Sequence, residues 1–189
     1  MNEGKDILNL ARNMQKLNAE IAALIKIYEK LLVAHGFQND SGNSITKDLS
    51  TSLQEPQLWT PLWMYRILKN KADRDDVIIL NIVLDSPDES DEVQEPLVLC
   101  ARFFYRKGQA SNGVGEWDPW DLWFGKAADK TGQLYSKSDL KLESEKFRTY
   151  ADWSKECIQT MKDIRFLAVP LARLVDRKAV EEQIILRIL

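Results

Sequence analysis

Two short apolar runs, separated by an acidic segment, constrain the fold of this chain more than any other feature. They span residues 77–84 and 97–105, are rich in Val, Ile and Phe, and have Asp, Ser and Pro between them. This pattern is typical of two strands joined by a hairpin loop. Successive side chains of a strand point to opposite faces, so each run presents one wholly apolar face that must be covered. The sequence therefore predicts a half-buried antiparallel pair and an α+β fold, in which a small antiparallel sheet packs with helices.

A regular apolar stripe precedes these strands. Residues 5–35 are expected to form one long helix, because apolar side chains recur alternately three and four positions apart through four heptads. A narrow stripe suits one partner helix and a wide stripe suits a core. The stripe is narrow in its first half and is widened in its second half by Ile25, Ile27 and Leu32. Its members are Ile7, Leu10, Met14, Leu17, Ile21, Leu24, Tyr28 and Leu31.

Two interpretations of this helix stay open at the level of the sequence. In the first, the N-terminal half projects and self-associates through Ile7, Leu10, Met14 and Leu17, since a second copy is the simplest cover for an exposed apolar strip. The protein would then be a homodimer. In the second, the whole helix folds against its own domain, and a predicted helix over residues 139–165 covers the strip.

Composition divides the chain into three parts. Residues 1–36 form the long helix, a candidate coiled coil; the polar residues 37–54 are expected to be a linker; residues 55–189 form the α+β domain. Thr60-Pro61 predicts the start of a helix over 61–70, because a hydroxyl cap followed by Pro commonly opens a helix. Further patterns predict a third strand at 121–124, the helix at 139–165, a strand at 166–175 that Pro170 confines to a sheet edge, and a final helix capped by Asp176.

The charge balance argues against several classes of partner. The 189 residues carry a formal charge of −3 with a pI near 5.4, so no general basic field is available for nucleic acid or anionic membranes. No apolar stretch approaches the roughly 20 residues of a membrane span, and no secretory leader is recognised. We therefore expect a cytoplasmic protein. The two cysteines, Cys100 and Cys157, are too few for a disulfide framework and lack metal-ligand spacing.

Catalytic signatures are sparse. His35 is the single histidine, and its place at a helix end is explained by the helix C-terminus, which favours a cation. No phosphate loop, Cys-x-x-Cys pair or nucleophile elbow is present. The segment 85–95 holds six acidic residues, but its spacing does not match a calcium loop, and a solvated hairpin loop is expected. We predict no catalytic residue, no cofactor and no metal.

The most individual stretch is residues 116–125, where three tryptophans recur at intervals of three beside three carboxylates. Three functions are weighed for it. The favoured one is a non-enzymatic assembly or adaptor protein that presents this Trp-rich acidic surface to an unidentified protein. The alternative is a small-molecule-binding or sensory module with a Trp-lined pocket, and the third is a metal-dependent phosphodiesterase or nuclease. The residues concerned are Trp117, Trp120 and Trp123 for binding, and Glu116, Asp118 and Asp121 for binding or, in the third case, for a metal.

Overall fold

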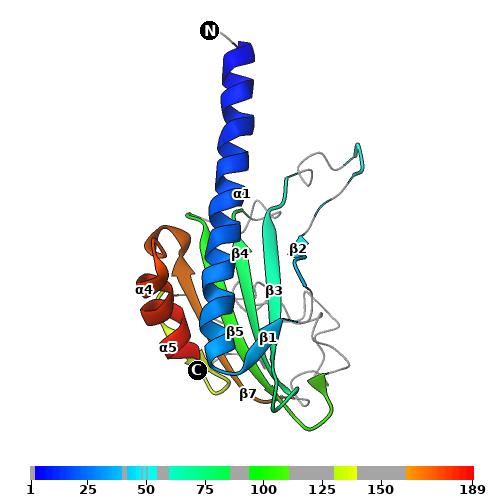
Figure 1. Cartoon of the computed structure of the whole chain (residues 1–189), viewed down its shortest axis with the longest axis vertical. Helices are drawn as coiled ribbons and strands as arrows, with labels where there is room; N and C mark the ends of the chain where they lie inside the picture. The colour runs from blue at the N-terminus through cyan, green and yellow to red at the C-terminus, as the bar shows by residue number, and fades with distance from the viewer. Residues whose placement is uncertain are drawn as a thin grey trace.

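The protein combines one long N-terminal helix with a seven-stranded antiparallel sheet (Figure 1). The structure is a computed structural model of the whole chain. It describes residues 3–39, 42–47, 49, 51–54, 60–85, 94–110, 130–139 and 161–189. The α+β class predicted from the sequence is confirmed.

The two apolar runs form the centre of the sheet, as β4(Asp76–Val83) and β5(Leu97–Tyr105). They pair antiparallel, with Val83 opposite Leu97 and Asp76 opposite Phe104, so the predicted pairing is confirmed to within a residue at each end. Every residue of β4 is buried. The expectation of a half-buried pair is therefore wrong for β4, because the sheet carries a hydrophobic core on each of its faces.

Residues 61–70, predicted as a helix, instead contain β3(Trp63–Asn70), which pairs antiparallel with β4. The burial alternates along β3, with Met64, Arg66 and Leu68 buried and the residues between them partly exposed. This period of two is that of a strand. The Thr60-Pro61 signal was misleading, because Pro also fits an extended chain just before a strand.

The outer strands complete the order β1-β3-β4-β5-β7-β6, with β2 also pairing with β3. β1(Phe37–Asn39) and β2(Thr46–Lys47) line up along the same edge of β3. The polar stretch 37–54 thus contributes two short strands to the sheet. At the other side, β6(Leu134–Ser136) pairs with β7(Met161–Pro170).

β7 corrects two predictions. Residues 161–165 were assigned to the end of a helix over 139–165, yet they belong to this strand; residues 140–160 lie outside the described residues. The register shifts between Phe104 and Tyr105 of β5, and Met161 and Ile164 both reach the same core although they are three positions apart. A bulge in β7 therefore imitates helical spacing. Pro170 ends a strand that lies between β5 and β6, so its predicted place on an edge strand is also wrong.

One face of the sheet is covered by helices. The second half of α1(Glu3–Ala34) lies across it beside the C-terminal segment (Figure 1), which comprises α4(Arg177–Val180), the π-helical turn η5(Glu181–Ile185) and α5(Leu186–Ile188). Asp176 caps α4 as predicted, since its carboxylate accepts a hydrogen bond of 2.8 Å from the Ala179 amide. α1 ends before Gly36, whose φ of 85° suits the expected glycine cap.

Two arginines of the sheet hold the C-terminal segment through hydrogen bonds, and one of them also forms a largely buried ion pair with Asp76. Arg102 of β5 donates from Nε and Nη2 to the two carboxylate oxygens of Asp76 at 2.8 and 2.7 Å, and from Nη1 to the Leu189 backbone oxygen at 2.6 Å. Arg165 of β7 donates to the same Leu189 oxygen at 2.6 Å. The end of α5 is therefore held by two adjacent strands.

Candidate functional site

The apolar stripe of α1 changes its environment halfway along the helix. Its last four members are buried: Ile21, Leu24, Tyr28 and Leu31 are 3%, 8%, 0% and 4% exposed. Its first two, Ile7 and Leu10, are 71% and 67% exposed, while Met14 and Leu17 are partly exposed. The N-terminal half of α1 extends past the end of the sheet (Figure 1). Of the two interpretations that the sequence left open, the structure shows the one in which this half projects.

The exposed and buried halves share one side of the helix. Seven residues of an α-helix turn the side chain by nearly two full turns, so a heptad stripe drifts by only about 20° per repeat. Ile7 and Leu10 therefore face nearly the same direction as Ile21 and Leu24, which contact the sheet. The side chains of the exposed half therefore point to the same side of α1 as the sheet, in the region beyond the end of the sheet.

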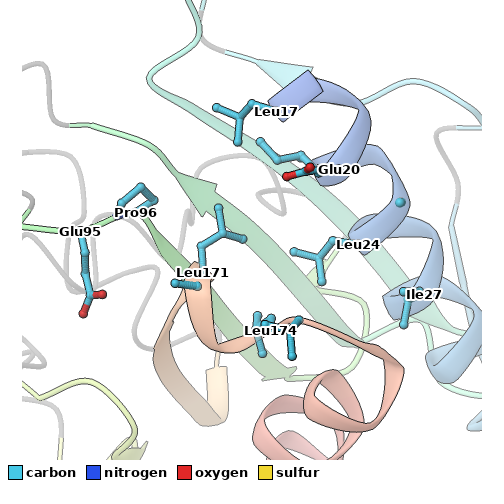
Figure 2. Close-up of a pocket in the computed structure, with 12 residues that line it drawn as sticks. Leu17, Glu20, Leu24, Ile27, Glu95, Pro96, Leu171 and Leu174 are labelled. Atoms are coloured by element: carbon cyan, nitrogen blue, oxygen red, sulfur yellow. The ribbon is translucent and has the colours of Figure 1, made fainter. Parts of the chain in front are cut away.

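An apolar groove of about 630 Å³ lies where the two halves meet. Figure 2 shows Leu17, Leu24 and Ile27 of α1 on one side and Leu171 and Leu174, from the turn after β7, on the other. Glu20 and Glu95 also belong to its lining, and in Figure 2 the Glu95 carboxylate points away from α1. The groove thus continues the exposed stripe toward the core and carries negative charge.

The buried pair beneath α1 has no reactive character. Tyr28 Oη and Cys100 Sγ share a hydrogen bond of 3.1 Å, and both side chains are fully buried. Burial raises the pKa of Cys100 to about 12 despite the opposing hydrogen bond from Tyr28. Burial first, and then the neighbouring Cys100, raise the pKa of Tyr28 well above its usual range. Both groups stay protonated in neutral solution, where a thiol is a poor nucleophile.

The sequence-predicted binding residues fall outside the described residues. These are Glu116, Trp117, Asp118, Trp120, Asp121 and Trp123, together with the predicted strand 121–124 and most of the acidic segment. Of the other tryptophans, Trp63 is partly buried in β3 and stacks on Tyr65 with ring centroids 5.6 Å apart. Among the residues that the structure describes, no three His, Cys, Asp or Glu side chains gather as a metal site requires.

The sequence did not indicate the groove itself. Leu171 and Leu174 come from a turn that the apolar run 166–175 suggested was strand, and Pro96 precedes a strand far away in the sequence. Only the narrowing of the α1 stripe pointed to this end of the molecule. In the described part of the chain, no helix is long and apolar enough to cross a membrane.

The class of protein is thus an α+β chain whose antiparallel sheet carries a projecting N-terminal helix. Comparison with protein-family models, curated proteins and solved structures returns no match for this chain. Function is therefore inferred from its own geometry.

Proposed function

We propose that this chain is a non-enzymatic assembly protein of the cytoplasm that forms a homodimer through the projecting half of α1. The observation that carries the proposal is the exposure of Ile7 and Leu10 on a stripe that is buried further along the same helix. An exposed, contiguous apolar strip marks an interaction surface. In this proposal the Trp-rich acidic segment 116–125 binds a second, unidentified protein.

The direction of the stripe selects an antiparallel dimer. A second helix that ran parallel to α1 against this stripe would continue into the space between α1 and its sheet, which Leu24, Tyr28 and Leu31 already fill. An antiparallel helix meets the stripe without entering that space, and its own sheet lies at the far end. The symmetric register pairs Ile7 with the partner's Leu17 and Leu10 with the partner's Met14. The twofold symmetry forms each pair twice, so all four stripe residues of both helices are covered.

The groove supports the same arrangement. In this register the first turn of the partner helix lies level with the start of the groove, near Glu20. A helix N-terminus carries a partial positive charge of roughly half a unit and is stabilised by nearby carboxylates. Glu20 and Glu95 provide two such carboxylates in the lining, and the partner's Asp6, which comes to lie near Glu20 in this register, offsets part of the attraction.

The expected affinity is modest. Eight partly buried apolar side chains contribute on the order of 10 kcal/mol, at somewhat more than 1 kcal/mol each. Association subtracts several kcal/mol for lost rigid-body freedom. A dimer of this kind dissociates in the micromolar range or above, so the concentration of the experiment matters.

Sedimentation equilibrium between about 10 and 500 μM tests the proposal. The wild-type chain should dimerise, and Leu10→Lys should be a folded monomer, because the lysine charge would be desolvated in the seam. Leu8→Lys is the matched control: Leu8 is also exposed, at 46%, but lies beside the stripe, so this variant should still dimerise. A wild-type protein that stays monomeric over the whole range contradicts self-association.

A further inference from the structure

A second pocket, of about 180 Å³, lies on the flank of α1 opposite the groove, between the helix, the stretch 43–47 and β3. Its floor is apolar and buried, formed by Ile21, Ile25 and Met64. Among the described residues, its polar lining carries three cations, Lys26, Lys47 and Arg66, against one carboxylate, that of Glu29. The pocket therefore joins an apolar floor to an excess of positive charge.

Among the residues that the structure describes, one nitrogen of the Arg66 guanidinium has no hydrogen-bond acceptor. Its side chain is only 5% exposed, although guanidinium groups are seldom buried without full pairing. Nε donates to Glu29 Oε1 at 2.5 Å, and Nη2 donates to the Gly42 backbone oxygen. Nη1 is shielded from solvent, and within the described part of the chain it has no hydrogen-bond partner. Buried donors of a charged group are strongly unfavourable when unpaired, so an acceptor held inside the protein would stabilise this arrangement.

The surrounding chain is already fixed around Arg66. The Gly42 oxygen accepts a second hydrogen bond, of 2.6 Å, from Asn39 Nδ2. Glu29 orients the guanidinium from α1, while β2 places Lys47 opposite Met64 of β3. The cationic groups thus come from three separate elements that converge on one small cavity, as in sites built for an anion.

We propose that this pocket binds a small organic anion, in which a carboxylate or phosphate group pairs with Arg66, Lys26 and Lys47 and a short apolar chain covers the floor. Glu29 balances one of the three cations, so a bound monoanion leaves one net positive charge and a dianionic phosphate group leaves the site neutral. A volume of about 180 Å³ equals the share of roughly six liquid waters, which suits a short chain and not a drug-sized ligand. The inference is independent of self-association, because it rests on the opposite flank of α1.

Methyl NMR provides a direct test, because Met64 lies in the floor and the chain has only 4 methionines. Hexanoate should shift the Met64 methyl and saturate below about 20 mM, an affinity reasonable for a small ligand. Met161, in the core on the other face of the sheet, should not move. Comparing the affinity of hexyl phosphate with that of hexanoate distinguishes a phosphate site from a carboxylate site. Acetate and inorganic phosphate lack the apolar chain and test its contribution, whereas hexanol and hexylamine keep the chain but lack the negative charge.

Variants of exposed lysines preserve the fold while changing the site. Lys26→Glu with Lys47→Glu should weaken hexanoate at least about tenfold, whereas Lys30→Glu with Lys162→Glu changes the net charge equally outside the pocket and should stay within about twofold. Arg66→Lys keeps the charge but removes Nη1 and should also weaken binding about tenfold. The proposal is overturned if about 20 mM hexanoate leaves Met64 unshifted, or if hexanol binds as well as hexanoate. The first result would mean a cavity filled by water, and the second an apolar cavity that does not select for charge.

Discussion

Reversing the charge of Asp6 should strengthen the proposed dimer. Asp6 precedes Ile7 on the stripe and Glu20 precedes Ile21, so both flank the seam on the same side of the helix. In the antiparallel register they become neighbours across the dimer, Asp6 facing the partner's Glu20, and symmetry creates this like-charge contact twice. Flanking charges of this kind set the orientation of paired helices. Asp6→Lys converts both repulsions into attractions.

The size of the effect follows from the exposure of these groups. The Glu20 side chain is 65% exposed and also faces Lys16 at 3.8 Å, so each interaction should lie at the low end of the range for exposed ion pairs, about 0.3 to 0.5 kcal/mol. Removing two repulsions and adding two attractions then gives about 1 to 2 kcal/mol. The dimer dissociation constant should fall roughly 5- to 30-fold.

Sedimentation equilibrium at about 0.05 M and 0.5 M salt measures this change, and the gain should shrink at high salt because exposed charges are screened. Asp6→Lys with Glu20→Lys restores a like-charge contact and should return the affinity to near that of the wild type. In a parallel dimer Asp6 would instead lie beside the partner's Ala11, and neither variant would matter. A dimer that persists with an unchanged dissociation constant in Asp6→Lys at low salt would refute the antiparallel register while leaving self-association intact.

Two further predictions concern the core. The pKa of Cys100 is raised from 9.0 to about 12 in the folded state, so above pH 9 the folded state keeps a proton that the unfolded chain releases. The contribution of the thiol to the free energy of unfolding is therefore full below pH 9 and falls by about 1.4 kcal/mol per pH unit as the pH rises toward 12. Urea unfolding between pH 8 and 10 should therefore show the free energy of unfolding of the wild type falling toward that of a Cys100→Ala, Tyr28→Phe variant. If the two free energies change with pH in parallel, the prediction is contradicted. Arg102→Met leaves the Asp76 carboxylate, 7% exposed, buried without its cation and should lower the free energy of unfolding by about 3 kcal/mol. The exposed Arg106→Met is its control, and a loss below about 1 kcal/mol for Arg102→Met would show that solvent reaches Asp76.

The parts of the fold that could be predicted were those with a strong local pattern. Continuous Val, Ile and Phe runs located β4 and β5, and the heptad stripe located α1. β3 was missed because Thr60-Pro61 is a local signal compatible with a helix start, whereas the alternation of Met64, Arg66 and Leu68 becomes decisive only once β4 supplies a pairing edge. The bulge in β7 could not be foreseen, since it depends on the partner strand.

The two cavities differ in how far the sequence could reach them. The change in width of the α1 stripe allowed a projecting, exposed half as one of two interpretations, but it predicted no groove. The wall opposite α1 comes from Pro96 and Leu171, which are distant in the sequence and meet only in the folded sheet. The anion pocket had no sequence signal, because Lys47 lies in a stretch that its polar composition assigned to a linker and Arg66 lay in a predicted helix.

The continuity of α1 has a mechanical consequence. The helix runs from Glu3 to Ala34 without interruption, and its buried half propagates helical order into the projecting half, which would be too short to be stable alone. No hinge separates tip from body, so the projecting residues act as a rigid spacer of about 20 Å at 1.5 Å per residue. Whatever binds the tip is held at a fixed height and angle above the end of the sheet, and inserting or removing a few residues there would rotate the bound partner as well as move it.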